Sequence, residues 1–204
     1  GNTPELAASS ILNASGSGPA SYTSIIIRPA GGSARTITAA TTAGLPMIDL
    51  NGADNVTIDG LNTGGNSLTI SNTTVSASSN TSTIRFIADA TNNTITNVSV
   101  LGSSSMAVGT NGGNILFAAG AIATGSDNNT ISNCNIGPAA PNLPTKGIHF
   151  GGTSNADPGT GNSGNAVTNN NIFDYFGASV ASAGIYVASG TPSATFANNR
   201  FYQT

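Results

Sequence analysis

Charge is scarce in this chain. Lys, Arg, Asp and Glu make up 6% of its 204 residues, against about 25% in ordinary soluble domains. The formal net charge is −3 and the few basic residues form no cluster, so the sequence offers nothing to neutralise the phosphates of a nucleic acid. No apolar run approaches the roughly 20 residues that cross a bilayer, so we expect no membrane insertion.

Cysteine is nearly absent as well. The lone Cys134 excludes an internal disulfide and a metal site built from cysteines, and we expect neither a metal nor a cofactor. No secretory signal is visible, which leads us to expect a fragment or a processed form of a longer secreted protein.

Small and uncharged polar residues are abundant instead: Asn, Ser, Thr and Gly together make up half of the chain. These residues disfavour helix interiors, and most of the large aliphatic residues are β-branched Ile or Val. The composition predicts a folded, all-β, turn-rich protein. The length fits one domain spanning residues 1–204.

A repeat with the template N-x-Φ-x-N-x-x-Φ, in which Φ is apolar, recurs along the chain from about residue 56 onward. Its lead apolar positions, a degenerate first copy included, are 37, 36, 36 and 29 residues apart and are Ile58, Ile95, Ile131, Val167 and Phe196. A second series of apolar–x–apolar strands alternates with it and consists of Ile48–Leu50, Ile84–Phe86, Ile115–Phe117, Ile148–Phe150 and Ile185–Val187. We expect Ile25–Ile27 to be its first member.

Two strand families that alternate at about 36 residues indicate a coil whose turns stack on one another. We predict an all-β parallel β-helix of about five to six turns, with coils over residues 24–204. The second Asn of each copy is expected to form a ladder of stacked amides through Asn97, Asn133, Asn169 and Asn198. A β-sandwich fits the fixed repeat less well, and a propeller needs four strands per blade and stays open as an alternative.

Residues 1–23 differ from the coils and are expected to cap them. Thr3, Pro4 and Glu5 have the residue types of a helix start, with a capping hydroxyl, a proline and an acid in the first turn. A short helix here would cover the open edge of the coil.

The segments Ile25–Gly32 and Ile48–Leu61 resemble the opening turns of secreted bacterial right-handed parallel β-helix proteins of the pectate-lyase-like superfamily. The later repeats are similar to the turns of that group, which gives a resemblance over roughly residues 24–204. It implies a right-handed coil and an extracellular or cell-surface location. It says little about activity, because the superfamily includes lyases, hydrolases, adhesins and structural fibres.

The acids do not form a catalytic arrangement. A polysaccharide lyase needs a bound cation beside a base, and a glycoside hydrolase needs two carboxylates facing one bond. Asp54 and Asp59 come closest to a cluster, but they flank a strand, where an Asp usually caps backbone N–H groups. We therefore predict no catalytic residues.

One column of the second strand series gathers reactive side chains. Its central positions, expected to point outward, are Asp49, Arg85, Leu116, His149 and Tyr186. The resemblance implies that such a face forms a substrate groove, so Asp49, Arg85, His149 and Tyr186 are candidate ligand-binding residues. The alternative is an ordinary surface ion pair beside a surface His and Tyr.

The function predicted from the sequence is a non-catalytic structural or adhesive module outside the cell. Its partner would be a second copy, stacked end to end through the uncapped turn at residues 201–204, or an extracellular glycan. Binding or degradation of carbohydrate is the main alternative. Ice binding, through the outward Thr94, Thr96, Thr130 and Ser132, is a weaker one.

Overall fold

A computed structural model describes residues 3–4, 7–118, 125–139, 141–152 and 161–204. The regular secondary structure of these residues consists of β-strands, in three parallel sheets. A helix long and apolar enough to cross a membrane does not occur among them.

The sheets are called A, B and C. Sheet A contains β1 (Thr3–Pro4), β4 (Ala34–Ala39), β7 (Ser67–Asn72), β10 (Val98–Gly102), β13 (Asn135–Pro138), β16 (Asn171–Phe173) and β19 (Arg200–Tyr202). Sheet B contains β2 (Ser10–Asn13), β5 (Pro46–Asn51), β8 (Ser82–Ile87), β11 (Gly113–Phe117), β14 (Lys146–Phe150) and β17 (Ala183–Val187). Sheet C contains β3 (Ile25–Ile27), β6 (Val56–Asp59), β9 (Thr94–Thr96), β12 (Thr130–Ser132), β15 (Ala166–Thr168) and β18 (Thr195–Ala197).

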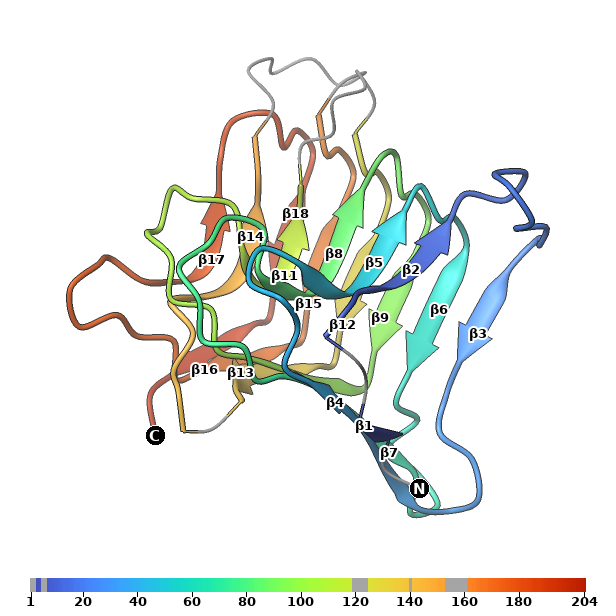
Figure 1. Cartoon of the computed structure of the whole chain (residues 1–204), viewed down its shortest axis with the longest axis horizontal. Coiled ribbons are helices and arrows are strands. Elements are labelled where there is room, and N and C mark those ends of the chain that lie inside the picture. The colour runs from blue at the N-terminus through green and yellow to red at the C-terminus, as the bar shows by residue number, and fades with distance from the viewer. Residues whose placement is uncertain (1–2, 5–6, 119–124, 140, 153–160) are drawn as a thin grey trace.

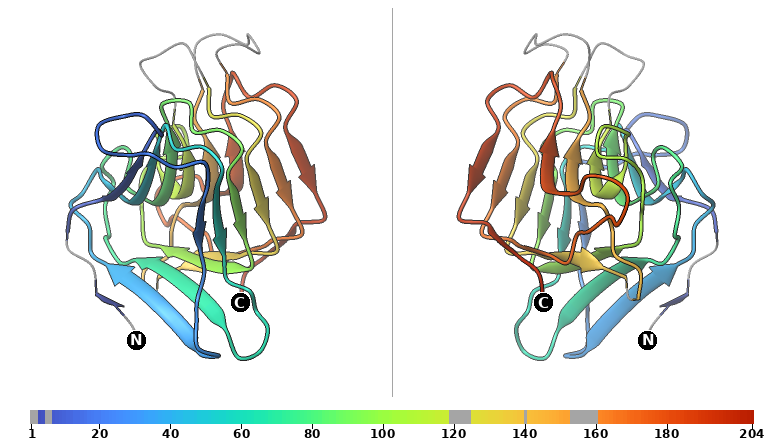
Figure 2. Two further views of the ribbon diagram at one scale, coloured as in Figure 1. Left: turned by 90° about the vertical axis from the view of Figure 1, so that its right-hand side faces the viewer. Right: turned by 90° about the vertical axis from the view of Figure 1, so that its left-hand side faces the viewer.

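The chain visits sheets B, C and A in turn, and each strand pairs in parallel with the strand one turn later. This arrangement is a parallel β-strand solenoid, as predicted, because all strand pairs of the three sheets among the described residues are parallel, unlike those of a sandwich or a propeller. The spacing of the repeat is the spacing of the turns, because Ile58 pairs with Ile95 and Ile95 with Ile131. The N- and C-terminal ends lie at opposite ends of the coil (Figure 1), and Figure 2 views it from each end.

Each copy of the N-x-Φ-x-N-x-x-Φ template forms two strands and not one. In the second copy, Thr94–Thr96 belongs to sheet C and Val98–Gly102 belongs to sheet A, with Asn97 at the corner between them. The assignment of Ile25–Ile27 to the second strand series was wrong. This strand pairs with β6 in sheet C, and the first strand of sheet B is Ser10–Asn13.

The second Asn of the template turns the chain. Its four members have a positive φ of 57°, 54°, 58° and 57° at Asn97, Asn133, Asn169 and Asn198. Asn tolerates this left-handed conformation better than other side-chain-bearing residues, which explains its recurrence at these positions. The amide of Asn97 donates to Asp59, and the other three side chains are exposed. The ladder predicted at these four residues is therefore placed at the wrong positions.

The stacked amides belong to the first Asn of the template. Asn93, Asn129 and Asn165 are fully buried. The backbone N–H and side-chain amide of Asn93 both donate to Oδ1 of Asn129, at 2.9 and 3.0 Å, and Asn129 donates to Asn165 in the same way at 2.8 and 3.1 Å. Each amide also donates to a backbone carbonyl of the preceding turn, such as Ala53 or Ala90. The ladder thus satisfies buried groups where the chain enters sheet C.

The predicted N-terminal helix is wrong for the described residues. Thr3–Pro4 pairs with β4, and Ser10–Asn13 pairs with β5 from Ser10 opposite Ile48 onward. Glu5 and Leu6 of the predicted helix lie outside the described residues. An isolated helix this short is marginal, whereas the free edge of β5 offers a continuous row of hydrogen-bond partners.

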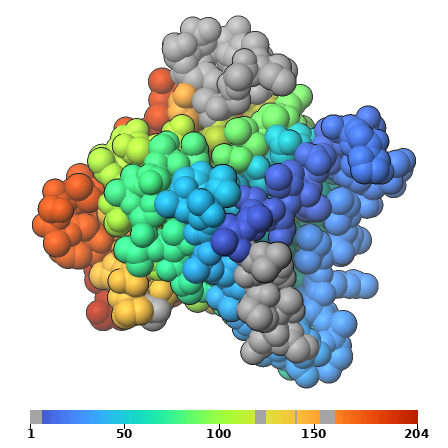
Figure 3. Space-filling view, viewed as in Figure 1, coloured from blue at the N-terminus to red at the C-terminus, as the bar shows by residue number. Residues whose placement is uncertain are grey.

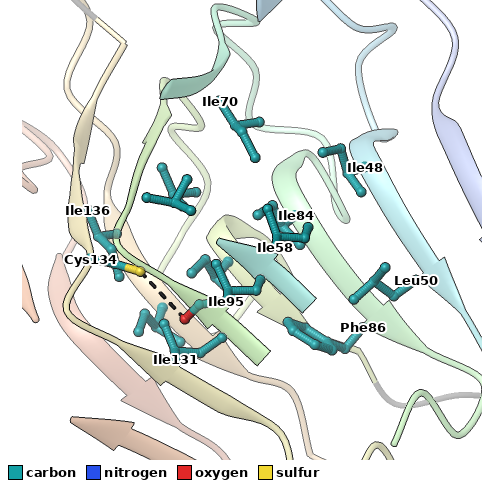
Figure 4. Packing of buried hydrophobic residues seen from close by; sticks show 14 of the residues in the cluster. Ile48, Leu50, Ile58, Ile70, Ile84, Phe86, Ile95, Ile131, Cys134 and Ile136 are labelled. Carbon is teal, nitrogen blue, oxygen red and sulfur yellow. Dashed lines mark hydrogen bonds between the residues drawn. The ribbon is translucent and has the colours of Figure 1, made fainter. Parts of the chain in front are cut away.

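The core consists of columns of inward-facing, mainly aliphatic and aromatic residues, one column for each inward position of the strands (Figure 4). The rings of Phe86, Phe117 and Phe150 stack with centroids 4.4 and 4.3 Å apart. Cys134 is buried among these columns, with its sulfur 3.6 Å from the Ile95 carbonyl oxygen. Burial raises the pKa of Cys134 to about 11, so the thiol is a small core side chain, as expected, and not a nucleophile.

We predict that Asn129→Ala lowers the free energy of unfolding by about 2–4 kcal/mol. Two buried donors of Asn93 lose their acceptor, at about 1–3 kcal/mol each. Asn135→Ala is the control: it removes an exposed amide whose bond to Asn171 is also exposed, and it should change stability by less than about 0.5 kcal/mol. Equal effects of the two variants in urea denaturation would contradict the structural role of the buried ladder.

Candidate functional site

The column predicted from the second strand series exists in sheet B. Asp49 pairs with Arg85, Arg85 with Leu116, Leu116 with His149, and His149 with Tyr186. The structure therefore brings the four candidate ligand-binding residues into one row on the outer side of the sheet. The row does not lie open, because Asp49, Leu116 and His149 are at most 4% exposed.

Asp49 and Arg85 form a two-pronged ion pair. The Arg85 Nε donates to Oδ1 of Asp49 at 2.9 Å and Nη2 donates to Oδ2 at 2.7 Å. The two side chains are 16% and 6% exposed, so both charges are largely withdrawn from solvent and neutralise each other. Such a pair fixes β5 against β8, and its polar groups are already used internally.

His149 is held in a buried, neutral form. Its Nδ1 lies 3.2 Å from the carbonyl oxygen of Gly112, and since a carbonyl only accepts, Nδ1 carries the hydrogen. Its ring meets that of Tyr186 edge-on with centroids 5.0 Å apart. Burial lowers the pKa of His149 to about 4, and the charge of Lys146 acts in the same direction. A base that is neutral at physiological pH but has no access to solvent is poorly placed for proton transfer.

Lys146 explains why this part of the row is covered. This residue, on β14, is fully buried, and its Nζ donates to the carbonyl oxygens of Ala107 and Val108 at 3.0 and 3.1 Å, and to that of Thr110. These acceptors belong to the connection at residues 103–112, between β10 and β11, which lies against β14 (Figure 1). In the space-filling view the green atoms from the middle of the chain form part of a continuous surface on this side (Figure 3).

Lys146 was not identified from the sequence. The only available signal was that it is the single lysine of the chain, in a strand otherwise rich in apolar residues. Burial lowers its pKa to about 8, so near neutral pH it remains mostly protonated and donates to three carbonyls at once. We call residues 103–112 the covering loop. Lys146 and His149, which bond to its carbonyl oxygens, are its two anchors.

Sheet C carries the columns of outward hydroxyl groups expected from the sequence. Thr94 pairs with Thr57 and Thr130, while Thr96 pairs with Asp59 and Ser132. The columns are interrupted at Ala166 and at Ala197. They form a partly exposed row of hydroxyls that covers the middle turns and not the whole face.

Outside sheet B, carboxylates cap backbone N–H groups at Asp54, Asp59 and Asp127, as predicted for Asp54 and Asp59. Oδ1 of Asp54 accepts from the Thr91 N–H at 2.7 Å. Oδ1 of Asp127 accepts in the same way from the Ser163 N–H at 2.6 Å, and each of these bonds joins neighbouring turns of the coil. Burial raises the pKa of the neighbouring Asp89. Within the part of the chain that the structure describes, no group of three or more His, Cys, Asp or Glu side chains could hold a metal ion.

Comparison of the chain with protein-family models, with curated proteins and with solved structures finds no match. Function therefore has to follow from the geometry of the chain itself.

We predict that acid destabilises the protein through His149. The pKa of His149 is about 4 in the folded protein and about 6.5 in the unfolded chain, so the unfolded chain binds the extra proton between these values. The free energy of unfolding should fall as the pH drops from 6.5 to 4. In His149→Phe this part of the pH dependence should disappear, while Tyr186→Phe should retain it. Urea denaturation over this pH range tests both, and equal slopes for wild type and His149→Phe would refute the assignment.

We also predict that Lys146→Met loosens the covering loop. Three loop carbonyls lose the ammonium group that donates to them and regain hydrogen bonds by turning toward water. Hydrogen exchange of amides 107–112 should accelerate at least several-fold, while the amides of β8 exchange as in the wild type. Arg35→Met, which removes an exposed bond to Ala30, is the control and should leave the loop unchanged.

Proposed function

We propose that this chain is a non-catalytic structural module of an extracellular or cell-surface protein. The proposal rests on the polar side chains of the sheet B row, which bond within the protein. Asp49 and Arg85 neutralise each other, and His149 donates to the backbone of the covering loop. Lys146 is likewise saturated by three carbonyls. Side chains that are scarce in this sequence are thus used to hold turns and a loop in place.

The finer features of the proposal follow from the resemblance to secreted pectate-lyase-like β-helix proteins. We infer a right-handed coil, in keeping with the strong preference of parallel crossovers for that hand. Secretion fits the amide- and hydroxyl-rich composition of the chain.

End-to-end association of two copies is the second part of the proposal. At one end of the described coil, Phe196 and Phe201 are 41% and 47% exposed on the edge strands β18 and β19. At the other end, an apolar hollow of about 160 Å³ is lined by residues that include Leu12, Ile27 and Ile37. Aromatic side chains at one end and an aliphatic hollow at the other favour a head-to-tail contact, which leads to an open filament.

Glycan binding on the sheet B row, the main alternative, would require the covering loop to move, because His149 is buried beneath it. Ice binding is favoured only by the register of Thr94 and Thr96 with Thr130 and Ser132 on sheet C. We rank both below the structural role.

Sedimentation velocity over a wide range of protein concentration tests the association. We expect the wild type to form larger species as concentration rises and the Phe196→Asp, Phe201→Asp double variant to remain monomeric, because a charge at an apolar contact is costly to bury. Phe176→Asp, which alters a 55% exposed aromatic residue outside the edge strands, is the matched control and should associate like the wild type. A wild type that stays monomeric throughout would refute head-to-tail stacking.

A further inference from the structure

Two aromatic rings lie side by side on the outer face of sheet A. Phe173 of β16 pairs with Tyr202 of β19, and their rings are nearly parallel, with centroids 5.5 Å apart and an angle of 14° between the planes. Ile172, the neighbour of Phe173 in the strand, points into the core, so Phe173 and Tyr202 point outward. Both rings are only partly buried, so they present apolar surface on the outer face of sheet A.

Gly137 makes room for the first ring. It follows Ile136, which pairs with Ile172, so its position on β13 is opposite Phe173. A Cβ at Gly137 would lie closer to three atoms of the Phe173 ring than non-bonded carbons can approach. The ring therefore lies over the glycine, close against the sheet.

Hydrogen-bonding groups line the neighbouring column. Asn135 pairs with Asn171 and Asn171 with Arg200, and the Asn171 amide donates to Asn135 at 2.9 Å. The Arg200 guanidinium lies 4.6 Å from the centre of the Tyr202 ring. Among the described residues the only ion pair found joins Arg85 to Asp49, so Arg200 has no carboxylate partner there. We call Phe173, Tyr202, Arg200, Asn135 and Asn171 the ring platform.

We propose that the ring platform binds a polysaccharide whose pyranose units expose flat C–H faces, as all-equatorial β-linked chains do. The two rings offer apolar surface to those faces, while the exposed guanidinium and amides offer hydrogen bonds to the hydroxyls at their edges. A nucleic acid would need several cations beside the rings, and the platform has one. The ligand is therefore neutral and sugar-like.

This inference adds a ligand to the proposed structural module and rests on the extracellular or cell-surface location proposed for it. It uses a different sheet from the sheet B row and does not require the covering loop to move. Phe173, Asn135 and Asn171 lie on β13 and β16, inside the edge of sheet A, whereas Arg200 and Tyr202 lie on the edge strand β19 that also takes part in the proposed end-to-end contact.

Depletion of the protein from solution by insoluble cellulose and by insoluble chitin tests the proposal. We expect the wild type to bind at least one of the two polymers, and Phe173→Ala and Tyr202→Ala to bind roughly tenfold more weakly, which corresponds to about 1.4 kcal/mol each. Tyr202→Phe keeps the ring and should bind nearly as well as the wild type. Phe176→Ala removes an exposed aromatic residue outside the platform and should bind unchanged.

Folding of each variant is checked by its urea midpoint, and the binding comparison uses Tyr202→Phe against Tyr202→Ala if Phe173→Ala does not fold. No depletion of the wild type by either polymer overturns the proposal, and so does equal weakening by Phe176→Ala, which indicates non-specific adsorption. Sedimentation of the same samples without polysaccharide reports on self-association separately, so the two proposals fail independently.

Discussion

At each corner the chain has to change direction within one or two residues without leaving a buried N–H unpaired, and at several corners of the described coil a pair of adjacent asparagines meets both demands. In Asn92–Asn93 and Asn128–Asn129 the first residue has a φ of 58° or 53°, which turns the chain, and the second is buried with its amide bonded to the next turn. Asn169–Asn170 repeats the arrangement at the next corner, where the Asn170 amide donates to Asn199. The three sheets and the core columns depend on these corners, because a wrong turn would shift every inward residue of the following strand.

The scarcity of charge is a consequence of the same architecture. A coil whose outer faces carry many Thr, Ser and Asn side chains needs few ions to be wetted, and three of the charged side chains in the described part of the chain are bound internally. Arg85 neutralises Asp49 across two turns, and Lys146 holds a loop instead of reaching solvent. The chemistry available to a ligand is then mainly stacking and neutral hydrogen bonding, which is what the ring platform offers.

The repeat spacing and the inward columns could be predicted from sequence, because period-two alternation at Ile84–Phe86 or Ile148–Phe150 directly reports which side chains face the core. The third sheet could not, since Asn97 and Asn133 sit in the middle of what reads as one continuous motif. Which asparagine of the motif points inward depends on the φ angle at the corner, and composition does not reveal it. The sequence predicted that His149 points away from the core. It could not predict that His149 is buried, because the loop that covers it lies 37 residues or more earlier in the chain and no local pattern indicates the contact. The residue types at Thr3 and Pro4 are those of a helix start, but this segment pairs with the edge of sheet A at β4 and forms a strand.

The direction of the hydrogen bonds has a mechanical consequence. In all three sheets the backbone bonds run along the coil from one turn to the next, and the two ends of the chain lie at opposite ends of that axis. A pull between the ends therefore acts along the bonds of one interface at a time, and not across all strands together. Under tension such a coil would unfold one turn at a time from an end, because each turn contacts only its neighbours. Each step would release the residues of one turn and lengthen the chain, so the coil would act as an extensible tether.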